Sequence, residues 1–176
     1  HQCQMVRDES GRDLGIRGSN RDITEQKRIE TELRASETRY RTLFETMAEG
    51  FALHEMIRDA SGQPFDYRFL EVNPAFERQT GLKAADLIGR TVREVMPDIE
   101  PMWIERYGRV ALTGKPEQFE APSNSLGRDF EVRAYQAAPG RFATVFTDIT
   151  DRKAAGEALA ESERDYRELV QTANSV

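Results

Sequence analysis

The sequence is poor in cysteine and contains no long apolar run. Cys3 is its only cysteine, which excludes an internal disulfide and a cysteine-based metal cluster and makes a reducing cytoplasm the expected setting. No apolar stretch approaches the roughly 20 residues that a membrane-spanning helix requires. The first residues show no positively charged start followed by an apolar block, so we expect no signal peptide, while an anchor elsewhere in a longer parent protein stays open.

The sequence also lacks an excess of positive charge, because its acidic residues outnumber its basic ones by 31 to 25. The formal net charge is -6 and no basic stretch offsets it, so we expect no binding to nucleic acid. The sequence contains no recognisable catalytic motif, phosphate-binding glycine loop or metal-ligand spacing, so we expect no catalytic residue, no metal site and no enzymatic activity of its own. Four acidic residues of the later strands are interpreted as solvated charges at strand edges. They are Glu117, Glu120, Asp129 and Glu131.

A repeat joins the two ends of the sequence. Asp22-Ile23-Thr24 recurs as Asp148-Ile149-Thr150, and the residues after the two copies match without a gap, as Leu33 does with Leu159. We therefore interpret the chain as a slice of an array of modules. The expected parts are residues 1–24 as the tail of a preceding module, 25–40 as a helical connector, 41–150 as one complete domain, and 151–176 as a second connector and the start of a following module.

Each copy of the tripeptide is followed by an amphipathic helix pattern. Thr24 and Thr150 are expected helix N-caps, so each tripeptide ends a strand and begins a helix. Apolar residues then recur at alternating steps of four and three, which is coiled-coil spacing. This connector stripe consists of Ile29, Leu33, Ser36, Tyr40, Leu43 and Met47, in which Ser36 is the one polar member. Two interpretations stay open, a helix packed against its own domain and a connector that pairs in a dimer, and the repeat favours the second.

The region between the connectors alternates between strand and helix patterns. Strands are expected at residues 51–57 and 67–72, short helices at 75–79 and 84–88, and a longer helix from about Glu100-Pro101 to Gly114. Asn73 is the expected N-cap of the first short helix, and Thr91 and Glu94 have capping-box spacing.

Three strands are expected to close the domain, within residues 117–121, at 130–135 and at 142–147. Leu126-Gly127 and Pro139-Gly140 are the expected turns between them. In the middle strand Phe130, Val132 and Ala134 alternate with Glu131, Arg133 and Tyr135. Such alternation is typical of an antiparallel sheet with one face on a core and the other facing water or a partner.

This order of elements resembles that of PAS domains. The motifs that carry the resemblance are Glu71-Val72-Asn73-Pro74-Ala75-Phe76, Thr80-Gly81, Asp86-Leu87-Ile88-Gly89 and Asp148-Ile149-Thr150. The resemblance covers about residues 40–150, with a partial second copy on either side. It implies an α+β fold in which a five-stranded antiparallel sheet carries short helices and one longer helix on one face, flanked by amphipathic connector helices. It also implies a sensory module of a multidomain bacterial signalling protein, such as a sensor histidine kinase or a cyclic-di-nucleotide enzyme.

The known cofactors of PAS domains can be tested against individual residues. Haem in this family is usually held by a histidine on the long helix, which here has none. His54 falls on the first strand, and we interpret it as a polar residue at the surface or at a dimer face. Photoreceptor members need a cysteine inside the domain to form a flavin adduct, and Cys3 lies outside it. A flavin bound without an adduct stays open, with Trp103 as a stacking residue or as part of the core.

A small organic ligand, such as an acid or a lipid-like molecule, is the leading positive interpretation. The candidates to line its cavity are Phe69, Phe76, Trp103, Tyr107, Phe130 and Phe146, with Arg133 or Tyr135 supplying a polar contact. The alternative for each aromatic residue is plain core packing, and a filled core without ligand is also compatible with the family.

We therefore expect a cytoplasmic module that binds a small ligand or relays a conformational signal. The signal would pass through Asp148, Ile149 and Thr150 into the helix that follows. The rival interpretation is a ligand-free dimerisation and spacer module in a tandem array. The expected partners are a second copy, paired through the sheet face and through Ile29, Leu33, Tyr40 and Leu43, and neighbouring PAS and output domains. Residues 1–24 are expected to be loosely held and to offer a strand to a sheet edge.

Overall fold

The computed structural model describes residues 3–7, 9–18 and 24–173. It divides the chain into two compact units, His1–Thr42 and Leu43–Val176. In the first unit β1 (Cys3–Arg7) and β2 (Asp13–Gly18) pair as an antiparallel hairpin, and helix α1 (Thr24–Thr46) begins. We expected residues 1–24 to offer a strand to a sheet edge. In the structure β1 and β2 pair with each other in a two-stranded sheet. Asp22 and Ile23 of the first tripeptide lie outside the described residues.

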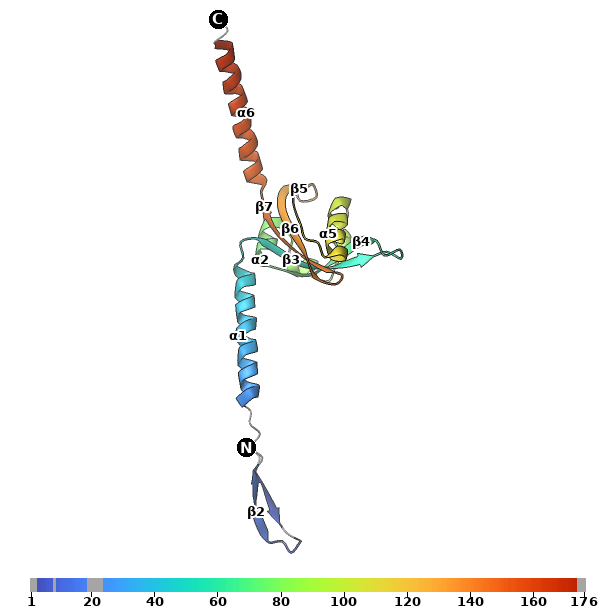
Figure 1. The fold of residues 1–176 in the computed structure, drawn as a ribbon, viewed down its shortest axis with the longest axis vertical. Helices are drawn as coiled ribbons and strands as arrows, with labels where there is room; N and C mark the ends of the chain where they lie inside the picture. The colour runs from blue at the N-terminus through green and yellow to red at the C-terminus, as the bar shows by residue number, and fades with distance from the viewer. Residues whose placement is uncertain (1–2, 8, 19–23, 174–176) are drawn as a thin grey trace. The chain divides into compact units, whose positions relative to one another are not determined.

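A five-stranded antiparallel sheet forms the centre of the second unit (Figure 1). Its strands are β3 (Gly50–Arg58), β4 (Pro64–Val72), β5 (Glu117–Ser123), β6 (Arg128–Ala138) and β7 (Arg141–Asp148). Their spatial order is β4-β3-β7-β6-β5, so β3 pairs with both β4 and β7. The three closing strands are neighbours in one sheet, as the sequence predicted, and β7 lies beside the strand that opens the domain.

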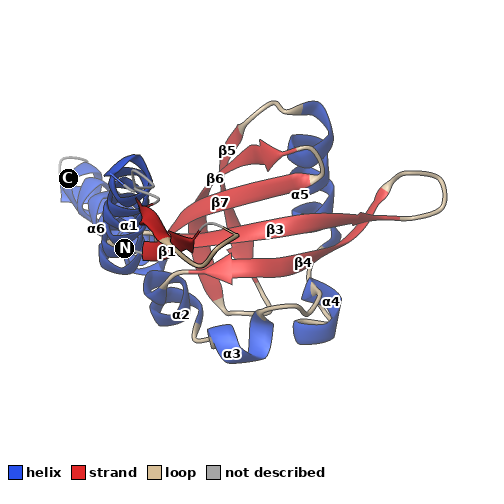
Figure 2. Cartoon of the chain, turned by 90° about the horizontal axis from the view of Figure 1, so that it is seen from below, coloured by secondary structure: helices blue, strands red, loops and turns tan. Residues whose placement is uncertain are grey.

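Four helices connect β4 to β5 and cover one face of the sheet (Figure 2). They are α2 (Pro74–Thr80), α3 (Ala84–Leu87), α4 (Val92–Val95) and α5 (Pro101–Thr113). Asn73 caps α2 through a hydrogen bond from the amide of Phe76, and Thr91 and Glu94 form the predicted capping box of α4. The expected α+β fold, with short helices and one longer helix on one sheet face, is therefore confirmed.

The hydrophobic core lies between the sheet and the helices that cover it. In β6 the side chains of Phe130, Val132 and Ala134 are buried, and on α5 Trp103 and Val110 are buried. Burying a large apolar side chain contributes about 1.5–3 kcal/mol to folding, so this aromatic-rich layer stabilises the sheet against the helices. Asn73 adds a buried polar link, because its carboxamide bonds the backbone of Glu49, Phe51 and Phe76.

Helix α6 (Thr150–Ala173) follows β7 directly. Four residues of the connector stripe on α1 are exposed in the single chain, Ile29, Leu33, Tyr40 and Leu43, with Leu33 at 58% and its repeat counterpart Leu159 on α6 at 63%. None of the helices in the described part of the chain is both long enough and apolar enough to cross a membrane.

Candidate ligand cavity and signal-transfer site

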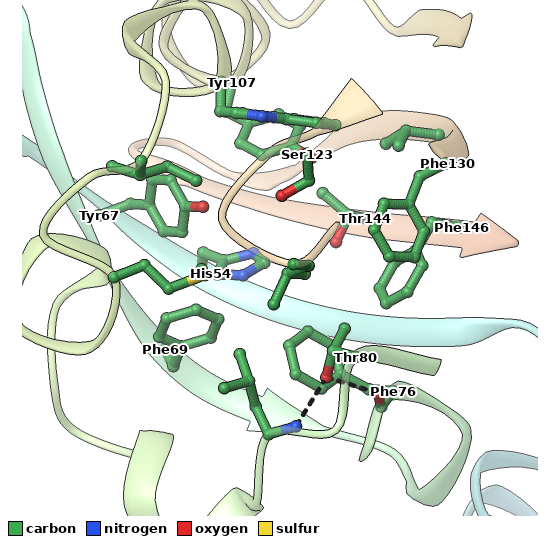
Figure 3. A pocket seen from close by; sticks show the side chains of 16 residues that line it. His54, Tyr67, Phe69, Phe76, Thr80, Tyr107, Ser123, Phe130, Thr144 and Phe146 are labelled. Atoms are coloured by element: carbon green, nitrogen blue, oxygen red, sulfur yellow. Dashed lines mark hydrogen bonds between the residues drawn. The ribbon is translucent and has the colours of Figure 1, made fainter. Parts of the chain in front are cut away.

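A cavity of about 70 Å³ lies between the sheet and the helices (Figure 3). All five strands of the sheet and the helices α2 and α5 contribute to its wall, together with the segments before α5 and between β5 and β6. Sixteen residues line it: His54, Tyr67, Phe69, Phe76, Thr80, Leu82, Met96, Ile99, Trp103, Tyr107, Ser123, Leu126, Phe130, Val132, Thr144 and Phe146.

The structure brings six of the predicted site residues together around this cavity. They are Phe69, Phe76, Trp103, Tyr107, Phe130 and Phe146, and all are buried. Their rings form edge-to-face contacts, such as Phe76 with Phe146 at 5.4 Å between centroids. The indole nitrogen of Trp103 donates to Glu100, so its polar atom is already satisfied. These contacts serve core packing as well, and they leave the prediction of a ligand role for each ring open.

The position predicted for His54 is wrong. This residue is 3% exposed and lines the cavity, whereas a position at the surface or a dimer face was predicted. Ala52, His54 and Met56 are the buried side of β3, and Leu53 and Glu55 are only partly buried on the other side. The register explains the placement, because His54 lies between Phe69 of β4 and Phe142 of β7 in the middle of the sheet.

The imidazole of His54 is enclosed by aromatic rings. Phe142 stacks on it at 4.6 Å between centroids, and Tyr67 and Phe69 contact it at 4.9 and 5.0 Å. Burial lowers the pKa of His54 to about 3, and a backbone hydrogen bond with Phe142 opposes this shift without reversing it. The ring is therefore neutral at physiological pH. Its Nδ1 atom is buried and has no hydrogen-bond partner.

The other polar groups of the cavity are uncharged. Figure 3 shows the hydroxyls of Ser123 and Thr144 beside the space that His54 faces. The Thr80 hydroxyl donates to the carbonyl of Phe76. Burial raises the pKa of Tyr67 and Tyr107 above the ordinary tyrosine value, so both phenols stay protonated. None of the sixteen described lining residues is Asp, Glu, Lys or Arg.

Arg133 and Tyr135 lie away from this cavity. Both are exposed, Tyr135 at 41%, while Val132 and Ala134, which alternate with them along β6, face the core. Arg133 is paired in register with Val145, on the face of the sheet opposite to the helices. The expectation that either residue supplies the polar contact of the cavity is thereby corrected, because strand alternation turns both side chains to the other face. His54, Ser123 and Thr144 supply polar atoms instead.

A hydrogen-bonded junction forms where β7 becomes α6. The carboxylate of Asp148 accepts from the amide and hydroxyl of Thr150 at 3.0 and 2.5 Å and from Arg128 at 2.6 Å. Burial alone would raise the pKa of Asp148, but these hydrogen bonds outweigh it and the pKa is lowered. Ile149 is buried, and its amide donates to the carbonyl of Asp129. All three residues of the tripeptide are thus hydrogen-bonded to Arg128 or Asp129 at the start of β6.

The first turn of α6 is also held to the sheet by ion pairs. Lys153 contacts Asp129 at 2.9 Å, and Arg152 contacts Glu120 at 2.8 Å and Glu131 at 3.5 Å. Three of the four acidic residues that the sequence analysis interpreted as solvated are therefore paired with α6. The fourth, Glu117, contacts Arg106 and Arg109 of α5.

Gln79 links the cavity wall to this junction. It lies on α2 between the lining residues Phe76 and Thr80. Its side-chain oxygen accepts from the amide of Asp148 at 2.8 Å, and its side-chain nitrogen donates to the carbonyl of Ala48 at 2.8 Å. One side chain thus connects the segment that enters the domain with the segment that leaves it.

The sequence contained a signal for some of the missed residues and none for others. Thr144 alternates with Phe142 and Phe146, so its buried position follows from the strand pattern. Ser123 lies just beyond the predicted end of its strand. Gln79 carries no local signal, because its partners are far away in the sequence. Among the described residues, no group of three or more His, Cys, Asp or Glu side chains is arranged to hold a metal ion.

Known structures of similar fold come from several organisms. The PAS domain of an HTR-like protein from Haloarcula marismortui is 21% identical, with 70% of this chain and 99% of that chain covered and a TM-score of 0.49. A LOV protein from Rhodobacter sphaeroides is 18% identical, with 62% and 65% covered and a TM-score of 0.47. A domain of a sensory box sensor histidine kinase/response regulator from Geobacter sulfurreducens is 18% identical, with 66% and 96% covered and a TM-score of 0.43.

The sequence itself carries the family assignment. No curated protein matches the chain. A family model described as PAS domain matches residues 38–111, which run from the end of α1 through β3, β4 and the short helices into α5. The motifs that resemble PAS sequences around Asn73, Gly81 and Gly89 lie inside this match. The chain therefore contains a domain of the PAS family.

Proposed function

We propose that this PAS domain is an input module that binds a small organic molecule in the cavity and passes the resulting change to α6. PAS domains are generally sensory or signalling modules, and the cavity supports ligand binding in this one. The observation that carries the proposal is the buried Nδ1 of His54, which has no partner and belongs to a cavity wall. Buried polar atoms are ordinarily satisfied, so an orphan at a cavity marks a place where a ligand or water is expected.

The route to α6 is short. A ligand that displaces Phe76 or Thr80 would move α2, and Gln79 on the same helix bonds the amide of Asp148. Asp148 in turn bonds Thr150 at the start of α6. A ligand shifts this junction only to the extent that it binds one arrangement more tightly than the other.

We also propose that the module acts in the cytoplasm, as part of a larger signalling protein, and that it has no catalytic activity of its own. The expected ligand is a small organic molecule and not haem or an adduct-forming flavin. Residues 101–113 of α5 contain no histidine, and the single cysteine, Cys3, belongs to β1 outside the sheet of the second unit. A visible absorption band in the purified protein would contradict this expectation.

Mass spectrometry of gently purified protein under native conditions tests the ligand. A reproducible mass increment that disappears after denaturation supports the proposal. Protein that is free of any bound molecule, and that binds none from a small-molecule library, would contradict it.

A second candidate function is dimerisation through the connector helices. It is favoured by the exposure of Ile29, Leu33, Tyr40 and Leu43, which share coiled-coil spacing on α1. The matching positions Leu159, Tyr166 and Leu169 of α6 are also exposed. Such stripes suit pairing with a second copy of the chain. A ligand-free spacer in a tandem array would need only this pairing and no bound molecule.

A further inference from the structure

Two features of the cavity wall indicate the class of ligand. The wall has no charged side chain among its described residues, and Nδ1 of His54 has no hydrogen-bond partner. We propose that the cavity selects an uncharged molecule, smaller than benzene, that carries one hydrogen-bonding group and places this group against Nδ1 of His54. The inference rests on the proposed function, because it names the class of ligand for the same cavity.

The hydrogen-bonding requirement comes from His54. Its side chain is almost fully buried, and Nδ1 has no partner among the described residues. The rings of Phe142, Tyr67 and Phe69 pack against the imidazole, and the hydrogen bond between His54 and the backbone of Phe142 leaves Nδ1 without a partner. A purely apolar guest would fill the space and leave this nitrogen unsatisfied, whereas a guest with a suitably placed polar group would satisfy it.

The requirement for an uncharged guest comes from the rest of the wall. The sixteen described lining residues include no side chain that is charged at neutral pH. Glu100 is outside the lining, and its carboxylate already accepts from the indole nitrogen of the lining residue Trp103 and from the amide of Asn124. An ionised guest would lose its hydration without gaining a counter-ion, which is strongly unfavourable.

The size limit comes from the volume. At about 70 Å³ the cavity exceeds the roughly 10–15 Å³ that one water needs, and it is about half of the ~150 Å³ of an engineered apolar cavity that binds benzene. A five-membered ring or a short alcohol or amide suits this space. The acid and the lipid-like molecule that the sequence suggested are disfavoured, because Arg133 faces the other side of the sheet and a lipid chain is too large.

Three five-membered rings test the inference on the full chain. Pyrazole is uncharged and offers both a hydrogen-bond donor and an acceptor, thiophene has a similar shape without a strong hydrogen-bonding group, and pyrrolidinium is charged. Because one net hydrogen bond corresponds to about a tenfold change in affinity, pyrazole should bind about tenfold more tightly than thiophene. Pyrrolidinium should not bind in the cavity.

Nitrogen-15 NMR of histidine-labelled protein gives a direct readout, because the sequence contains only two histidines, His1 and His54. Titration with pyrazole should move the Nδ1 resonance of His54 and leave that of His1 in place. Thiophene should not produce the same shift. The wild-type protein suffices for this measurement, so it does not depend on a variant that folds.

A variant supplies the matched control. In His54→Phe, which keeps a flat ring at the position, the preference for pyrazole over thiophene should fall from about tenfold to about one, with circular dichroism used to verify the fold. Equal binding of pyrazole and thiophene to the wild type, or binding of pyrrolidinium in the cavity, would overturn the inference and leave ligand binding itself in place. Failure of all three rings to bind would also overturn it, and native mass spectrometry would then decide the fate of the proposed function separately.

Discussion

The neutral imidazole of His54 makes the stability of the domain depend on pH. Its pKa is lowered from 6.5 to about 3, so the unfolded chain takes up a proton that the folded chain excludes. The stabilisation is complete above pH 6.5 and is lost as the pH falls from 6.5 toward 3, by about 1.4 kcal/mol per pH unit within that window. Urea unfolding of the wild type should therefore give a free energy of unfolding about 2 kcal/mol lower at pH 5 than at pH 7 from this residue alone.

His54→Phe isolates this contribution. The variant should lose much less stability between pH 7 and pH 5, while His1→Gln, which removes the other histidine, should behave as the wild type does. The titratable side chains that face His54 are Tyr67 of β4 and Tyr107 of α5, and the raised pKa of each keeps it neutral throughout this range. Equal pH dependence in the wild type and in His54→Phe would contradict the assignment.

Gly108 allows α5 to approach the start of β4. A Cβ at this position would lie 2.3 Å from Cγ and 2.4 Å from Cβ of Pro64. Gly108→Ala should therefore destabilise the domain by about 1–3 kcal/mol through overpacking. Gly156→Ala on α6 is the matched control, because a Cβ there has no atom within 4 Å and alanine favours the helix by roughly 0.5–1 kcal/mol. Urea unfolding measures both, and a stabilised Gly108→Ala variant would refute the close-packing argument.

The residue scale also shows where prediction from sequence fails. The aromatic lining residues were found because strand alternation and helix periodicity identify buried positions. His54 was misplaced because β3 carries Leu53 and Ile57 on the side opposite to it, so local alternation favours a buried leucine and an exposed histidine. Only the pairing of β3 between β4 and β7 reveals that the His54 side of the strand meets the helices. Such pairing is a long-range property that one strand does not encode.

At the scale of elements, the junction between β7 and α6 depends on one carboxylate. Asp148→Ala removes hydrogen bonds from Thr150 and Arg128 and should destabilise the domain by about 1–3 kcal/mol. Amide hydrogen exchange should accelerate in the first turn of α6, where the amide of Lys153 donates to Ile149.

Asp151→Ala is the appropriate comparison for this variant. Asp151 also lies in the first turn of α6 but is exposed, so its removal should cost a few tenths to about 1 kcal/mol through the helix dipole alone. Equal acceleration of exchange in the two variants would show that Asp148 has no special role at the junction.

Most elements were predictable from local chemistry, and their spatial order was not. Caps and turn residues fixed the ends of α2, α4 and α5, since Asn73, the Thr91 capping box and Gly114 act within a few residues of the helices that they bound. The resemblance implied a five-stranded antiparallel sheet, but the order β4-β3-β7-β6-β5 was not predicted, because the contact between β3 and β7 joins segments about 90 residues apart. The cavity depends on that order, which explains why its polar residues were missed.

At the scale of the whole molecule, the exposed stripe on α1 predicts self-association. Leu33→Asp places a charge on the stripe and should shift the protein from dimer to monomer in sedimentation experiments. Ala35→Asp introduces the same charge on the same helix off the stripe, and Ala35 is exposed. This control should leave the mass unchanged. A wild-type protein that is monomeric, or a dimer that both variants retain, would count against pairing through this helix.

Coupling between the cavity and α6 is the property that distinguishes a sensor from a spacer. If α2 transmits the change, binding of pyrazole in the cavity should alter hydrogen exchange at the first turn of α6, because Gln79 joins α2 to the amide of Asp148. Gln79→Ala should still bind pyrazole, since Gln79 is not among the lining residues, but exchange at α6 should no longer respond. Gln118→Ala removes a different glutamine, which bonds Glu131 on the sheet, and should preserve the response. If saturating pyrazole leaves hydrogen exchange in α6 of the wild type unchanged, this ligand does not favour either arrangement of the junction. If the response persists in Gln79→Ala, the coupling does not pass through the Gln79 side chain of α2.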